Sequence, residues 1–210
     1  MPKNPTLLLA AAVAALLLPP MASAAERALD YAQLDVSSDS QSLVLARTLG
    51  EPRAADPAPL VTVAASRWAE GETFGAGIVA RRALVTGSSF AWRAGLGLGV
   101  DRFHDRGSDE NTRTGASLRA MTEADGALGP GRYYVLAQFS SFRSGRFATA
   151  QYTFDAGPGL DVARYIDRSY RATTVTLRLP LGRAGWAARL GAVRDDSGDR
   201  PFVGVMYNGF

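Results

Sequence analysis

Apolar and polar residues alternate with a period of two along most of this chain. The clearest case is the segment 90–103, in which every even-numbered residue from Phe90 to Val100 is apolar. The odd-numbered residues of the same stretch are small or charged, and they include Arg93 and Asp101. Because successive side chains of a β-strand point to opposite faces, this pattern predicts a strand with one apolar and one polar face.

The same alternation returns in five further segments, 74–81, 112–122, 133–140, 172–181 and 186–193. Turn-forming residues interrupt the chain at 37–40, 50–59, 69–72, 86–89, 104–111, 125–131, 143–146, 155–159, 166–169, 182–185 and 195–201. These breaks predict twelve strands, at a spacing that suits tilted membrane strands of about 9–11 residues. The pattern is weakest in 29–36 and 160–165, and ten strands remain without them.

The charged residues on the polar faces predict an enclosed interior. Arg93, Arg119, Arg178 and Arg189 lie opposite the apolar faces of their segments, as does Asp101. A charge on the lipid face of a barrel costs about 2–4 kcal/mol at the bilayer midplane, so we expect these five residues to line a lumen. Glu123, at the end of its segment, is a candidate for the same face. An excess of arginine there favours anions, whereas full pairing with carboxylates makes a closed salt-bridge plug.

The N-terminal residues have the organisation of an export signal. Lys3 precedes an unbroken apolar run at 7–18, two prolines follow it, and Ala22-Ser23-Ala24 provides a small-residue cleavage site. A spanning helix needs about 20 apolar residues, and this run is shorter. We therefore expect residues 1–24 to be a cleaved secretory signal peptide and residues 25–210 to form one domain.

The C-terminal segment 202–210 resembles the assembly signal of bacterial outer-membrane β-barrel proteins, which ends on an aromatic residue. Phe202, Met206 and Phe210 share one parity, and Tyr207 lies one residue out of register. The resemblance implies a single antiparallel transmembrane β-barrel of about 10–12 strands, an all-β fold. It also implies contact with outer-membrane lipid and with the barrel-assembly machinery through the last strand. A periplasmic or secretion-system partner is left open.

A soluble periplasmic β-sandwich or a lipocalin-like barrel is the alternative fold, because such proteins alternate too. Bulky aromatic residues near the predicted strand ends favour the membrane, since they match interfacial girdles; they are Phe90, Trp92, Tyr133, Trp186 and Phe202. With both chain termini in the periplasm, the breaks at 69–72, 104–111, 143–146, 166–169 and 195–201 face outward.

Composition removes several classes of function. The chain has no cysteine, which excludes disulfides and thiolate metal sites. Its net charge of +3 includes Lys3, and the arginines are scattered, so no nucleic-acid footprint is indicated. We expect no cofactor and no metal. His104, followed by Asp105, is interpreted as a solvated loop residue, and 195–199 as a surface turn instead of a calcium loop.

Two classes of function remain. The first is a small outer-membrane channel or a transport or secretion accessory for small or anionic solutes, with saccharides as one option. The second is a closed structural or interaction barrel of the cell envelope. A membrane-embedded hydrolase that relies on His104 is less favoured, since no motif places a nucleophile beside it, and we expect no enzymatic activity.

Overall fold

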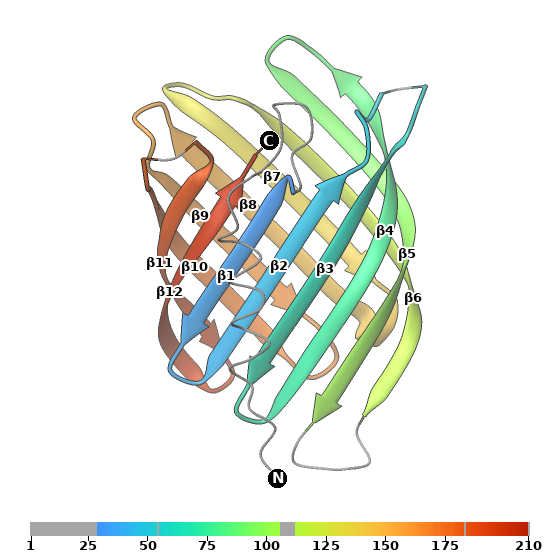
Figure 1. The fold of residues 1–210 in the computed structure, drawn as a ribbon, viewed down its shortest axis with the longest axis vertical. Helices are drawn as coiled ribbons and strands as arrows, with labels where there is room; N and C mark the ends of the chain where they lie inside the picture. The colour runs from blue at the N-terminus through green and yellow to red at the C-terminus, as the bar shows by residue number, and fades with distance from the viewer. Residues whose placement is uncertain (1–28, 54, 106–111, 183, 210) are drawn as a thin grey trace, which may run out of the picture.

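Twelve antiparallel strands close into one barrel in the computed structural model, which describes residues 29–53, 55–105, 112–182 and 184–209 (Figure 1). The strands are β1 (Tyr31–Ser37), β2 (Ser40–Thr48), β3 (Ala58–Trp68), β4 (Gly71–Thr86), β5 (Phe90–Asp105), β6 (Arg113–Ala127), β7 (Gly131–Ser140), β8 (Gly145–Phe154), β9 (Gly159–Ile166), β10 (Arg171–Pro180), β11 (Trp186–Asp195) and β12 (Gly198–Asn208). One 3-10 turn, η2 (Phe142–Ser144), joins β7 to β8. No helix within these ranges is long and apolar enough to cross a membrane.

Each strand pairs with its neighbours in sequence, and the seam is closed by β1 against β12. Tyr31 lies opposite Asn208 and Ser37 opposite Phe202. Closure leaves no strand edge unpaired, which is the condition for placing a sheet in hydrocarbon. The sequence-based prediction of an all-β antiparallel barrel of about 10–12 strands is confirmed, and the two weakest segments form β1 and β9.

The two ends of the barrel are distinguished by where the first strand begins and the last strand ends. The terminal end, uppermost in Figure 1, holds the start of β1 and the end of β12. The distal end, at the bottom, holds the β1–β2, β3–β4, β5–β6, β7–β8, β9–β10 and β11–β12 connections. The five predicted outward breaks therefore all fall at one end.

Several predicted breaks are too wide. Asp125 belongs to β6, His104 to β5, and Arg200 to β12, so the turns in question are shorter than the sequence predicted. Polar residues were interpreted as turn signals there, but a charged residue on the inward face can continue a strand when a nearby strand supplies its partner, as Arg93 does for Asp125.

The outer wall is apolar and exposed. Leu96, Leu98 and Leu118 have 73%, 61% and 65% of their surfaces accessible. This band on the outside of a closed barrel gives a surface suited to lipid. Aromatic side chains edge it at the terminal end, where Trp186 contacts Tyr207 with ring centroids 5.4 Å apart.

Phe202 corrects one expectation. It was assigned to the outward aromatic girdle, but it is buried and its ring lies 5.6 Å from the Arg189 guanidinium carbon. Met206, two positions on along the same face, is also buried, whereas Tyr207 occupies an outward position opposite Trp186. Phe210 lies outside the described residues. A role of these four residues in assembly stays a prediction.

Candidate functional site in the barrel lumen

Side chains that meet across an intervening strand must lie on the concave face of the barrel. Arg81 of β4 contacts Glu123 of β6, and Arg189 of β11 contacts Asp35 of β1. Strand pairing extends this inward face to every second residue along the wall. The arginines on it whose side chains are largely buried are Arg81, Arg93, Arg119, Arg178, Arg189 and Arg200. We call them the lumen arginines.

Glu123 joins two of the lumen arginines on the β4–β6 wall. Its carboxylate lies 2.7 Å from Arg81 Nη1 and 3.6 Å from Arg93 Nη1. Tyr134 donates its hydroxyl to the second carboxylate oxygen at 2.9 Å. The Arg81 and Glu123 side chains are only 5% and 4% exposed. A charge this deeply buried is tolerated because it is paired and hydrogen-bonded.

Two further ion pairs lie on the opposite wall. Arg178 Nε contacts Asp161 at 2.6 Å, and Arg189 Nη1 contacts Asp35 at 2.6 Å. Gln33 donates to the same carboxylate oxygen, Oδ2 of Asp35, also at 2.6 Å. The Arg189–Asp35 pair spans β12, so it ties together the two sides of the closing seam.

Arg119 lies flat on the wall made by β4 and β5. It contacts Asp101 at 2.7 Å and Thr62 of β3 at 3.2 Å. Gly77 and Gly99 lie directly beneath its guanidinium group, too close for a side chain at either position. Gly99 of β5 and Gly77 of β4 therefore make room for a large inward side chain.

The inward pairs are balanced in charge. Within the described residues the six lumen arginines are matched by six strand carboxylates, Asp35, Asp101, Glu123, Asp125, Asp161 and Asp195. Sequence parity had placed Asp101, and Glu123 as a candidate. The others were missed because they lie in the weakest predicted segments or in residues assigned to turns. An arginine excess in the lumen is not observed among these pairs.

The lumen arginines still have unused donors. The Nε groups of Arg81, Arg119, Arg189 and Arg200 are buried and make no hydrogen bond to another described residue. Buried donors are normally satisfied by protein or by water. These four N–H groups are out of reach of solvent, so contact with a solute is left to the exposed parts of the guanidinium groups, which are largest on Arg93 and Arg200 at 23% and 21% of the side chain.

An apolar layer crosses the lumen. Ala46, Leu60, Val79 and Met121 form a buried cluster, with Tyr31 and Leu136 packed against it. Tyr31 is on β1 and Leu136 on β7, which are opposite strands of the twelve. Side chains from both walls therefore meet, and the lumen is constricted at this level.

Arg143 covers part of the distal mouth. Its guanidinium carbon lies 3.7 Å from the ring centroid of Phe103, which in turn contacts Trp68 at 6.0 Å. Asp167 of the β9–β10 loop holds Arg143 through Nε at 3.1 Å. Arg143 and Ser144 have positive φ angles of 53° and 54°, the unusual backbone that turns this arginine inward. No sequence pattern predicted this placement of Arg143, because the segment 143–146 was interpreted only as a break.

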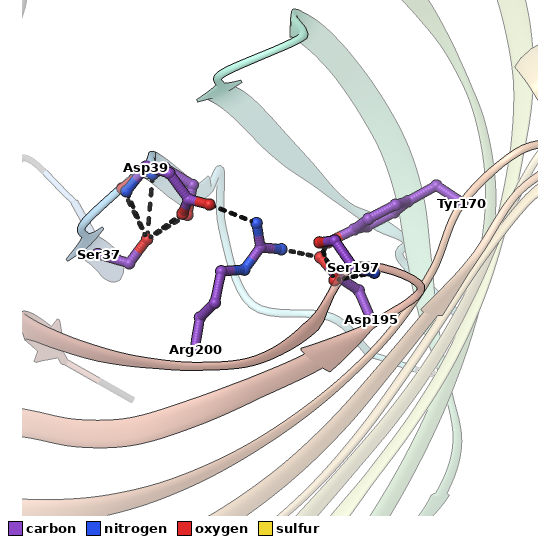
Figure 2. A network of polar contacts seen from close by, with 7 residues as sticks. Ser37, Asp39, Tyr170, Asp195, Ser197 and Arg200 are labelled. Carbon is purple, nitrogen blue, oxygen red and sulfur yellow. Dashed lines mark hydrogen bonds and ion pairs between the residues drawn. The ribbon is translucent and has the colours of Figure 1, made fainter.

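Arg200 links the distal turns to one another, as Figure 2 shows. It contacts Asp39 of the β1–β2 turn at 2.7 Å and also Asp195 at the end of β11. Tyr170 of the β9–β10 loop donates to Asp195 at 3.0 Å, and Ser197 donates to it as well. Hydrogen bonds from Arg200 and Ser37 hold the pKa of Asp39 below its usual range. The segment 195–199 is thus part of a hydrogen-bonded turn.

His104 lies near the distal end of β5, with Nδ1 2.7 Å from the Thr112 hydroxyl. Within the described ranges no group of three His, Cys, Asp or Glu side chains could hold a metal ion. The strongest concentration of polar chemistry in the described part of the chain is the set of ion pairs in the lumen.

Replacing Glu123 tests how far the lumen pairs stabilise the fold. Glu123→Gln leaves Arg81 and Arg93 facing a neutral group, and breaking a buried pair typically costs about 3–5 kcal/mol. We expect a drop of that order in the free energy of unfolding, measured by urea titration of the barrel in lipid vesicles. Asp199→Asn is the matched control, because the Arg194–Asp199 pair is 77% and 58% exposed. An equal loss in both variants would contradict this role of burial.

The position of the Arg119 guanidinium group is tested by the substitution Gly99→Ala. An alanine methyl group there displaces the guanidinium from Asp101, and overpacking of this kind costs about 1–3 kcal/mol. Gly115→Ala is the control, since its methyl group would meet Phe142 at an ordinary 3.6 Å. The same urea titration should show a loss for Gly99→Ala and little change for Gly115→Ala. No loss at Gly99 would mean that Arg119 is not held there.

Low pH should break the ion pair between Arg143 and Asp167, which we call the Arg143 clamp. Burial opposes ionisation of Asp167, but Arg143 and the amides of Ser169 and Tyr170 outweigh it and lower its pKa below the ordinary 3.8. A carboxylate whose pKa is lower in the folded state than in the unfolded state stabilises the fold at a pH above its unfolded pKa. The contact between Arg143 and Asp167 is therefore intact above about pH 4 and is lost as the pH falls further. Hydrogen exchange of those two amides, corrected for intrinsic rates, should accelerate only below pH 3.8. Asp167→Asn should show fast exchange at every pH.

No family model matches this chain, and no curated protein matches it. Among solved structures it is similar to the "KdgM porin", with a TM-score of 0.50, 13% identity, and coverage of 85% of this chain and 97% of that chain. The "KdgM porin in complex with disordered oligogalacturonate" has a TM-score of 0.49 and 14% identity, and the match covers 85% of this chain and 97% of that chain. A chain described as "Unveiling the Mechanism Behind the in-meso Crystallization of Membrane Proteins" has a TM-score of 0.51 and 12% identity, with coverage of 84% of this chain and 81% of that chain. At these identities the likeness concerns the fold, a closed antiparallel β-barrel.

Proposed function

We propose that this protein is a narrow outer-membrane channel for small polar solutes, with a preference for solutes that carry carboxylates, such as acidic saccharides. The observation that carries the proposal is the series of lumen arginines, of which Arg93, Arg119 and Arg200 keep part of their side chains exposed. A solute carboxylate or hydroxyl group can accept a hydrogen bond there while the arginine keeps its own carboxylate partner. The fold shared with the KdgM porin supports a channel.

The lumen arginines lie at successive depths. Arg200 is at the distal mouth, Arg119 lies further in, and Arg81 and Arg93 are on the terminal side of their strands. A charged solute entering from the distal end therefore meets one guanidinium group after another. Because each arginine is already neutralised by a carboxylate, binding at any one of them is weak enough to permit release, as conduction requires.

The apolar layer formed by Leu60, Val79, Met121 and their neighbours is the constriction in this proposal. Passage requires these side chains to move aside. Methionine is unbranched and flexible, so Met121 is the member of the layer whose rearrangement costs least.

A closed structural or interaction barrel is the second candidate, and the same layer favours it. Tyr31 and Leu136 approach from opposite walls. The lumen arginines are all paired with carboxylates. A barrel with this interior is stable without conducting.

Conductance in planar bilayers separates the two candidates. We expect small single-channel steps from the mature protein and larger steps from Met121→Ala, because that change thins the constriction. Leu60→Ala provides a second opening variant on a different strand. Absence of steps in the wild type and in both folded variants would reject the channel and leave the closed barrel.

Ion selectivity tests the part played by arginine. Arg119→Gln leaves the Asp101 charge unbalanced, so the reversal potential in a potassium chloride gradient should shift toward cation preference. Arg102→Gln is the control, since Arg102 lies on the outward face of β5 and is exposed. An equal shift in both variants would mean that surface charge alone sets selectivity.

A further inference from the structure

The two rims of the outer wall differ in chemistry. Aromatic side chains gather at outward positions toward the terminal end, on Trp92, Tyr133, Trp186 and Tyr207. Outward positions toward the distal end carry six arginines, Arg67, Arg102, Arg146, Arg164, Arg171 and Arg194, whereas Arg47 and Arg82 lie at the terminal end. Tryptophan and tyrosine suit any lipid interface, but a concentration of arginine favours anionic lipid head groups.

Three of these arginines form a cluster around Ile166. Arg146 of β8 and Arg171 of β10 lie opposite Ile166 in the two ladders that flank β9. Arg164 is on β9 itself, diagonal to both, and diagonal neighbours in a sheet are about 7–8 Å apart. Long side chains at these three positions can therefore converge on one group.

The cluster has no acidic counterpart among the residues that the structure describes. Arg146, Arg164 and Arg171 are exposed, and none takes part in an ion pair or side-chain hydrogen bond with another described residue. In β7 to β10 the strand carboxylate is Asp161, which faces inward to Arg178. The nearby Asp167 is held by Arg143. Three positive charges therefore face outward together without compensation.

An apolar groove runs down the outer wall from this cluster. A shallow cavity of about 550 Å³ is lined by Ala137, Phe139, Ala148 and Ile166, with Arg146 and Arg164 at its rim. A second cavity of about 560 Å³ continues it toward the terminal end and shares Ala137, Ala148 and Arg164. The lining side chains named here occupy outward positions, so the groove opens onto the lipid-facing surface.

We propose that the cluster and the groove form a binding site for a phosphorylated lipid of the lipid A class, in the leaflet at the distal end. Arginine binds phosphate through paired N–H donors and is the side chain best suited to it. A head group with two phosphates matches three converging guanidinium groups, and an acyl chain fills the apolar groove below. The site is separate from the lumen and does not depend on conduction.

Native mass spectrometry of the mature barrel in detergent, titrated with diphosphoryl lipid A, tests the site. A charge near an anionic lipid surface is worth about fivefold in affinity per arginine. The triple variant Arg146→Gln, Arg164→Gln, Arg171→Gln should therefore bind about 100-fold more weakly than the wild type. Migration of the unboiled protein on a denaturing gel establishes that the variant is folded.

The matched control removes the same charge elsewhere on the outer wall, with Arg47→Gln, Arg67→Gln and Arg102→Gln. This control should bind lipid A as the wild type does. Equal binding by the cluster variant and the wild type would overturn the proposal, and so would an equal loss in the control. Phosphatidylglycerol and dephosphorylated lipid A should both bind much more weakly than diphosphoryl lipid A. Equal binding of either would overturn the assignment of the lipid. A failed conductance experiment would leave these results untouched.

Discussion

Pairing of buried charge is the constraint on which this barrel depends. A twelve-stranded wall encloses more volume than apolar side chains fill here, and the remainder is occupied by arginine and carboxylate. The Arg189–Asp35 pair shows the consequence, because it reaches across β12 and holds β1, a strand of only seven residues, at the closing seam. Loss of either partner would leave an uncompensated charge at a site where both side chains are largely buried, which costs far more than the pair contributes.

Glycine is the complement of these arginines. Gly77 and Gly99 lie beneath Arg119, Gly159 lies 2.7 Å from Arg178 Nη2, measured from the position of an added Cβ, and Gly204 lies beneath Asp35. Each large charged side chain therefore rests on a strand that has no side chain at the point of contact. Glycine weakens an isolated strand, yet in this barrel it permits the ion pairs that join neighbouring strands. The large charged side chains that rest on these glycines fill the space above them, so the lumen is constricted despite its many small residues.

Much of the fold was predictable from sequence because a period of two survives wherever one face meets lipid. The alternation at 90–103, 112–122, 172–181 and 186–193 predicted the correct inward and outward faces, and it put Arg93, Arg119, Arg178 and Arg189 on the inward one. The alternation, however, shows only which face of a strand a residue lies on, and not which residue it pairs with. Asp125 and Arg200 were missed because polar residues near strand ends look like turns, and Arg143 because positive φ angles are not visible in composition. Phe202 was misassigned to the outer girdle for the reverse reason, since an aromatic residue can pack on an inward arginine as well as on lipid.

The contrast between the two faces of the wall strengthens the argument for an external anion. Inside, six arginines face six carboxylates among the described residues, and the pairing extends even to the turn residue Asp39. Outside, Arg194 has Asp199, but Arg146, Arg164 and Arg171 have no such partner within the described strands. Mutual repulsion of three close guanidinium groups disfavours the isolated fold, and water and salt relieve only part of it at a membrane surface. Negative charge supplied by the surrounding leaflet removes that repulsion, so the membrane completes at the distal rim the charge balance that the chain itself provides in the lumen.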